Sequence, residues 1–133
     1  MEYRVLETRS ADILTKYYNN EIDSFLNACH EDILWIGPAE KHVIRTRKAL
    51  VDAFLQEEHK LEFVLSDLKV FSIGLTECSC EVIMFFILDT IWPDSSVGRA
   101  DQRMQFTWVS ENGVEKIKLC HISNAIKALH GFK

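Results

Sequence analysis

Two runs of alternating apolar and polar residues near the end of the chain predict a β-hairpin. Between the runs, Glu111-Asn112-Gly113 supplies residues that tolerate a positive φ, so the spans 103–109 and 114–123 are expected to pair as antiparallel strands. The hairpin is the clearest local signal in the sequence, and the remaining elements can be arranged around it.

The alternation also predicts which side chains share a face of the hairpin. Lys116 and Lys118 indicate the solvent face of the second strand, so a period of two places four residues on its other face: Ile117, Leu119, His121 and Ser123. In the first strand, Met104, Phe106 and Trp108 form one row, and Arg103, Gln105 and Thr107 form the opposite row. We expect the apolar row to share a face with Leu119 and His121, as a core or as the wall of a pocket.

The first half of the chain predicts three helices and short strands. A helix begins at Thr8 or Ser10 and reaches position 19, and a second amphipathic helix covers 21–29. A strand over 33–36 ends at Gly37-Pro38, and a small strand is expected at 42–44. Thr46 then caps a third helix, which extends to about position 58.

The periodicity changes to two in the second half of the chain, where 61–75 and 77–92 predict two long strands. The second of these is apolar on both faces, unlike a sheet with one solvated face. Helices can cover one face, and the other needs a partner subunit or a sheet that closes on itself. We expect a homodimer through the convex face, formed by Ile83, Phe85, Ile87, Thr107, Val109 and Ile122.

The predicted fold class is α+β: a cone-shaped half-barrel in which three N-terminal helices pack on a strongly curved, mixed and mainly antiparallel sheet. With 133 residues and 47% hydrophobic content, the chain predicts a single domain over 1–133, including a tail at 124–133. This tail could also be the root of a linker to a further domain.

Charge, apolar run length and cysteine usage restrict the partners and the cellular location that the sequence predicts. A net charge of −5 offers no basic surface, so direct binding of nucleic acid by this domain is not expected. No apolar run approaches the roughly 20 residues that a membrane-spanning helix needs. The four cysteines lie within regular elements, and no signal peptide is recognisable, which predicts reduced thiols in a cytoplasmic protein.

Three segments resemble a known superfamily. LTKYYNNEIDSFLNACHEDILWIGP at the front, TRKALVDAFL in the third helix, and QRMQFTW with KIKLCHISN at the back are similar to the SnoaL-like and ketosteroid-isomerase-like superfamily, also named after nuclear transport factor two. The last pair looks most like the SnoaL-type sensory domains that bacteria place beside LytTR-type DNA-binding domains. The superfamily contains dehydratases, isomerases, carriers and assembly domains, so the resemblance implies the architecture and leaves the function open.

The isomerase-type members of this superfamily imply a carboxylate base and two acid groups. The corresponding positions fall near Gly37, Ile13 and Met104, none of which exchanges a proton. We therefore assign no catalytic residue, and His121 is the weak candidate, because an imidazole on an apolar inward face can shuttle a proton. The sequence shows no metal-ligand spacing and no cofactor motif, so no metal and no cofactor are expected.

The candidate ligand pocket combines apolar walls with a few polar groups. It comprises Trp35, Gln102, Met104, Phe106, Trp108, Leu119, His121 and Ser123. The sharpest expectation is that Trp35 and His121 border one cavity, and that Gly37 leaves space where the enzymes carry a carboxylate. Arg103 could instead form an ion pair with Glu81 or Asp89 across the sheet.

Three functions remain open at this level. The leading hypothesis is a non-enzymatic domain that senses a small molecule or mediates an interaction, such as the sensory part of a bacterial transcriptional regulator. The second is a small dehydratase or isomerase that uses His121, and the third is a structural dimerisation module. The identity of an unknown small-molecule ligand cannot be read from apolar walls, which specify size and flatness more than chemistry.

Overall fold

A computed structural model describes residues 1–39, 41–56 and 61–125 of the chain. Three helices precede most of the sheet: α1 (Tyr3–Tyr18), α2 (Asp23–Ala28) and α3 (Arg47–Leu55). The strands are β1 (Cys29–Ile36), β2 (Val43–Arg45), β3 (Glu62–Thr76), β4 (Ser79–Ile91), β5 (Val97–Glu111) and β6 (Val114–Asn124). The predicted order of elements is confirmed, while the end of the third helix near position 58 and the tail beyond Ala125 lie outside the described residues.

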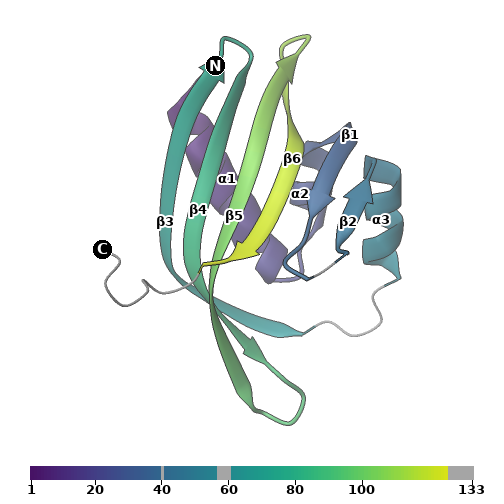
Figure 1. Ribbon diagram of the computed structural model, residues 1–133, viewed down its shortest axis with the longest axis vertical. Helices are drawn as coiled ribbons and strands as arrows, with labels where there is room; N and C mark the ends of the chain where they lie inside the picture. The colour runs from purple at the N-terminus through teal and green to yellow at the C-terminus, as the bar shows by residue number, and fades with distance from the viewer. Residues whose placement is uncertain (40, 57–60, 126–133) are drawn as a thin grey trace.

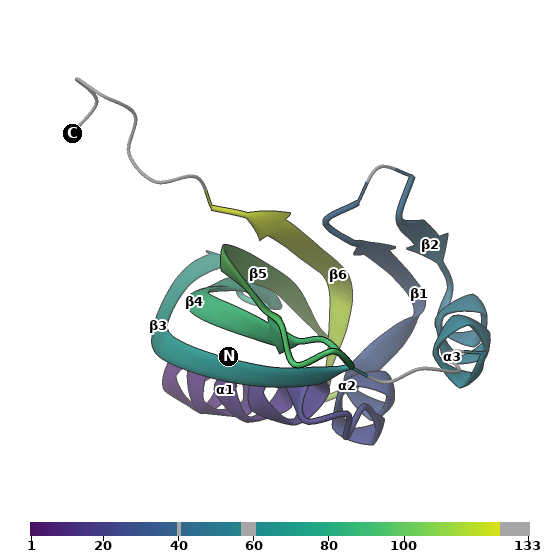
Figure 2. The ribbon, with the colours of Figure 1, turned by 90° about the horizontal axis from the view of Figure 1, so that it is seen from below.

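The six strands form one mixed sheet in the order β2-β1-β6-β5-β4-β3 (Figure 1). Only β1 and β6 pair in parallel, and every other neighbouring pair is antiparallel. The sheet curves over α1 and α2 without closing on itself, as Figure 2 shows from below. The prediction of a curved, mainly antiparallel α+β cone is therefore confirmed.

Local sequence signals account for two boundaries. The expected start of the first helix at Thr8 or Ser10 is wrong, because α1 begins at Tyr3 and both residues lie inside it. Asn112 and Gly113 both adopt a positive φ, at 54° and 77°, between the paired residues Glu111 and Val114, which is the geometry of a tight hairpin. The side chain of Thr46 accepts a hydrogen bond from the backbone N–H of Ala49 and caps α3 as predicted.

The helices cover one face of the sheet, which we call the inner face, and leave the outer face to solvent. At the centre of the inner face, the indole Nε1 of Trp108 donates a hydrogen bond of 2.9 Å to the hydroxyl of Ser10 on α1. Both side chains are fully buried. Phe25 on α2 stacks against Phe106 at 6.0 Å between ring centroids, so α1 and α2 are both anchored to β5.

The edge strand β3 approaches α1 closely at Gly74. A Cβ at this position would overlap the hydroxyl oxygen of Tyr3, so a larger residue here would displace the Tyr3 side chain. Farther along β3, the pairing register shifts between Ser66 and Lys69, and Asp67 takes a φ of 54°. This irregularity bends β3, and the bend adds to the curvature of the sheet.

A bulge in β6 overturns part of the face assignment made from the sequence. Thr107 pairs with Leu119, but the next residue, Trp108, pairs with Ile117, so Lys118 is an extra residue on β6. The inward side chains beyond this point are Cys120 and Ile122. The prediction that the Met104-Phe106-Trp108 row shares a face with Leu119 and His121 is therefore wrong, because one inserted residue reverses the alternation.

Candidate functional site

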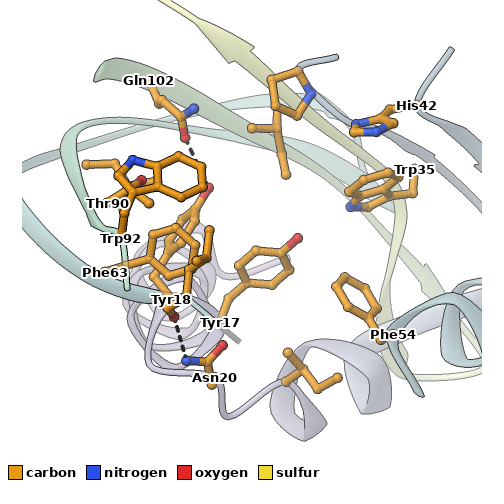
Figure 3. Close-up of a pocket in the computed structure, with 15 residues that line it drawn as sticks. Tyr17, Tyr18, Asn20, Trp35, His42, Phe54, Phe63, Thr90, Trp92 and Gln102 are labelled. Carbon is orange, nitrogen blue, oxygen red and sulfur yellow. Dashed lines mark hydrogen bonds between the residues drawn. The ribbon is translucent and has the colours of Figure 1, made fainter. Parts of the chain in front are cut away.

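A cavity of about 520 Å³ lies on the inner face, between the C-terminal end of α1 and the strands (Figure 3). Most of its wall is aromatic or aliphatic, which is typical of a site for a small organic molecule. The described lining residues are Tyr17, Tyr18, Asn20, Ile22, Trp35, Pro38, His42, Phe54, Leu61, Phe63, Leu88, Thr90, Trp92, Gln102 and Ile122.

The end of α1 supplies the floor of this cavity. Asn20 adopts a left-handed backbone with a φ of 64°, and its side-chain amide donates a hydrogen bond of 3.1 Å to the carbonyl of Leu61. This contact ties the turn after α1 to the start of β3. It places Tyr17 and Tyr18 where the helix ends and the cavity begins (Figure 3).

Aromatic rings meet edge to face around the cavity. Tyr17 contacts Phe54 of α3 at 5.8 Å between centroids, and Tyr18 contacts Phe63 of β3 at 5.4 Å. Trp35 contacts the same Phe54 ring at 6.3 Å. Because such contacts favour fixed ring orientations, they hold the wall of the cavity in one arrangement.

A short chain of hydrogen bonds forms the polar part of one wall. The hydroxyl of Tyr18 donates to Gln102 Oε1 at 3.2 Å, and Gln102 Nε2 donates to Asn124 Oδ1 at 3.2 Å. Burial, with a smaller contribution from Cys120, raises the pKa of Tyr18 above its ordinary value. The Tyr18 hydroxyl therefore stays neutral and acts as a donor at physiological pH.

Trp35 lies on the β1 wall, with only 9% of its surface exposed. Its indole Nε1 is buried and has no hydrogen-bond partner among the described residues. The ring is held between Phe54 and His42, whose centroid lies 6.1 Å away.

Gly37 does not leave the space that was predicted beside Trp35. A Cβ at Gly37 would lie 2.6 Å from Trp35 Cη2 and 2.9 Å from His42 Cβ, so these two side chains fill that space. The expectation of an opening at Gly37 is wrong, and the glycine instead permits the close approach of the two rings.

The residues predicted for the pocket separate into three groups. Trp35 and Gln102 are in the cavity lining. Met104, Phe106 and Trp108 are fully buried core residues outside that lining. The remaining three lie on the outer face, where Gln105 pairs with His121, Thr107 with Leu119 and Arg103 with Ser123.

His121 therefore does not border a cavity with Trp35, and this prediction is wrong. The bulge at Lys118 turns its imidazole to the face away from the helices. Because His121 lies on the outer face, it cannot act as an acid or base in this cavity. The titratable side chains in the described lining are Tyr17, Tyr18 and His42, and no carboxylate is among them.

The predicted dimer face is mostly one continuous surface. Ile83, Phe85 and Ile87 alternate with the buried residues of β4, and Thr107 and Val109 alternate with those of β5, so all five belong to the outer face. Ile122 does not, because it is 3% exposed, pairs with Met104 and lines the cavity. Its assignment to the dimer face is corrected for the same reason as that of His121.

The ion pairs predicted for Arg103 are not formed. Glu81 accepts hydrogen bonds from Gln105 and Thr107, and Asp89 forms a two-point contact with Arg99 at 2.8 and 3.0 Å. Arg103 lies over the ring of Phe85 at 5.3 Å, and its Nε is buried without a partner among the described residues.

Several lining residues were not assigned to the pocket from the sequence. From the sequence, Tyr17 and Tyr18 are expected only on the apolar face of a helix, His42 at the start of a small strand and Trp92 at the end of a long strand. What these residues share is their position at or beyond the end of an element. Aromatic residues at the ends of elements are the sequence signal that could have indicated this cavity, since side chains at such ends can point past the packed layers.

No metal site is apparent in the described part of the chain, where no group of three or more His, Cys, Asp or Glu side chains could hold an ion. In residues 1–39, 41–56 and 61–125, no helix is long and apolar enough to cross a bilayer. The four cysteines carry free thiols.

Comparisons with known proteins identify the architecture. No protein-family model and no curated protein matches the chain. A ketosteroid isomerase-like protein from Erwinia carotovora atroseptica superposes with a TM-score of 0.79 at 14% identity, covering 92% of this chain and 95% of that one. A protein with a cystatin-like fold from Caulobacter vibrioides gives 0.70 at 17% identity, covering 92% and 88%.

A third solved structure with this fold is a hub. The CaMKII hub of S. rosetta gives a TM-score of 0.69 at 12% identity, covering 92% of this chain and 95% of that one. At these identities the likeness shows the fold alone. This chain thus shares its fold with a ketosteroid isomerase-like protein, a protein with a cystatin-like fold and a hub.

Proposed function

We propose that this protein binds a small, largely apolar organic molecule in the cavity beside Tyr18 and Trp35, without catalysing its conversion. The observation that carries the proposal is the composition of the cavity: aromatic walls held by ring contacts, with a small number of placed polar groups. No paired carboxylates occur in its described lining to support acid–base chemistry.

A sensory role fits this proposal better than transport or catalysis. The resemblance of QRMQFTW and KIKLCHISN to sensory domains beside LytTR-type DNA-binding domains supports it. The acidic net charge also supports it, because a sensory domain leaves contact with nucleic acid to another domain. In this proposal residues 1–133 form one cytoplasmic, ligand-binding domain of a bacterial regulator. Gene neighbourhoods or longer chains that pair this domain with a DNA-binding domain would support the assignment.

The binding proposal is tested by filling the cavity. Thr90 lines it and pairs with Phe63, whereas the next residue of β3, Val64, pairs with Asp89 on the outer face. Thr90→Phe and Val64→Phe therefore add a ring at nearly the same height on opposite faces. A thermal-shift screen of small aromatic compounds is expected to give hits with the wild type and with Val64→Phe. Thr90→Phe should lose those hits while remaining folded, and equal hits in both variants would refute the cavity as the site.

We also propose that two copies associate through the outer face formed by Ile83, Phe85, Ile87, Thr107 and Val109. Two observations support this. Phe71 and Ile73 extend the surface onto β3 with 55% and 57% of their area exposed, and the Arg103 Nε lies buried there without a partner in the described part of the chain. The similarity of the fold to that of the S. rosetta CaMKII hub is a further reason to test self-association.

Sedimentation of the wild type and two lysine variants tests this surface. Ile83→Lys introduces a charge at its centre, while Val5→Lys places the same charge at an exposed residue of α1, on the opposite side of the sheet. We expect a dimer for the wild type and for Val5→Lys, and a monomer for Ile83→Lys. A wild type that remains monomeric at tens of micromolar would refute the proposal.

A further inference from the structure

The described wall of the cavity carries no fixed charge. Asp, Glu, Lys and Arg are all absent from its described lining residues. A charged ligand would lose its hydration on entering and would find no opposite charge in this wall to compensate. The composition therefore favours a neutral ligand over an anion or a cation.

Tyr18, Gln102 and Asn20 already have hydrogen-bond partners. Tyr18 donates to Gln102, Gln102 donates to Asn124, and Asn20 donates to the carbonyl of Leu61. A ligand gains little from competing with these hydrogen bonds, because each would have to be broken first.

The opposite wall differs, because the indole N–H of Trp35 is a buried donor without an acceptor among the described residues. Trp35 lines the cavity, and Figure 3 shows its nitrogen on the ring edge that is turned toward Tyr17 and the open space. Contacts with Phe54 and His42 hold this orientation. A buried donor of this kind is unfavourable until an acceptor reaches it.

We propose that the cavity selects neutral, flat molecules that present a carbonyl or equivalent acceptor oxygen to Trp35 Nε1. This inference rests on the proposed ligand-binding function and adds the chemical class of the ligand. The apolar body packs against the rings of Tyr17, Phe54 and Phe63, and the acceptor oxygen pairs with the indole donor. Trp35 is then the residue that determines specificity.

Three probes of similar size separate the contributions to binding. They are 2-acetylnaphthalene, which is neutral with an acceptor, 2-ethylnaphthalene, which lacks the acceptor, and 2-naphthoate, which is an anion. Binding is measured by titration calorimetry with the full chain and with two variants. Trp35→Phe removes the unpaired donor, and Trp92→Phe removes an indole from the half-exposed mouth of the same cavity.

The acetyl probe is expected to bind the wild type about tenfold more tightly than the ethyl probe, the ratio that one added neutral hydrogen bond supplies. Naphthoate should bind most weakly. Trp35→Phe should remove the preference for the acetyl probe, and Trp92→Phe should retain it. Equal binding of the acetyl and ethyl probes by the wild type, or a preference that survives Trp35→Phe, would overturn the inference while leaving ligand binding intact.

A spectroscopic readout avoids reliance on a variant that fails to fold. The three tryptophans give three indole ¹H–¹⁵N resonances, and the Trp35 signal should move downfield with the acetyl probe but not with the ethyl probe. Bound acetyl probe with an unshifted Trp35 indole resonance would overturn the inference. If none of the three probes binds, the proposed function itself fails and this inference fails with it.

Discussion

The hydrogen bond between Trp108 and Ser10 offers a sharp test of how the helices are held to the sheet. Ser10 is the only fully buried polar side chain among the described residues, and its hydroxyl accepts the indole N–H of Trp108 at 2.9 Å. Ser10→Ala removes the acceptor and leaves the donor in place. Because Trp108 is fully buried as well, no water can replace the lost partner.

The expected cost follows from two contributions. Removing the acceptor leaves the buried Trp108 donor unpaired, which costs about 1–3 kcal/mol. Alanine regains roughly 0.5 kcal/mol over serine through its higher helix propensity. We therefore expect the free energy of unfolding to fall by about 1.5 kcal/mol, which lowers Tm by roughly 4–8 °C for a chain of this length.

Urea denaturation followed by circular dichroism measures this change, with Thr8→Ala as the matched control. Thr8 lies on the exposed side of the same helix, and its hydroxyl bonds only to the carbonyl of Arg4 at 3.1 Å. The control should change the free energy of unfolding by less than about 0.5 kcal/mol. If Ser10→Ala falls within the same range, then the Trp108 indole has another acceptor and the proposed anchor is wrong.

Three further predictions concern other parts of the chain. In the native protein, one of the four thiols, that of the exposed Cys78, should react rapidly with Ellman's reagent. All four should react after denaturation, and two or more rapidly reacting thiols in the native protein would contradict the burial of the other three. Burial raises the pKa of the Cys29 thiol to about 12 from 9.0, and burial also raises that of Tyr18, so the neutral forms are favoured in the folded state. These two groups should therefore leave the free energy of unfolding unchanged up to about pH 9 and lower it between about pH 9 and 12, and the absence of that alkaline fall in chemical denaturation would contradict this. Thr46→Ala should lower the free energy of unfolding by about 1 kcal/mol, because it removes the side chain that caps the N–H of Ala49. Thr46→Asn should be at least as stable as the wild type, because asparagine caps helices and tolerates the φ of 76°. Thermal unfolding of the two variants tests both expectations.

The sequence alone was sufficient for the order and type of the elements. Local chemistry explains this success: Thr46 caps a helix, Asn112-Gly113 turns a hairpin, and a period of two marks the long strands. Each of these signals acts within a few residues along the chain. The same local basis explains why the sequence predicts the α+β class correctly.

The tertiary structure decided which side chains meet at the cavity. One extra residue, Lys118, shifts the alternation of β6, so His121 moves to the outer face and Ile122 moves into the cavity wall. A bulge depends on the partner strand, because it is defined by two residues facing one. Nothing in the β6 sequence alone distinguishes the bulged register from the regular one.

The cavity itself is also a product of packing between distant elements. Trp35 from β1, Tyr18 from α1 and Gln102 from β5 converge only when the sheet curves over the helix end. Local patterns determine elements because their interactions are short in sequence, whereas a pocket depends on long-range contacts and on the space they leave. For this chain, sequence therefore determined the architecture, and the three-dimensional packing decided the donor, the neutral wall and the residues that a ligand would touch.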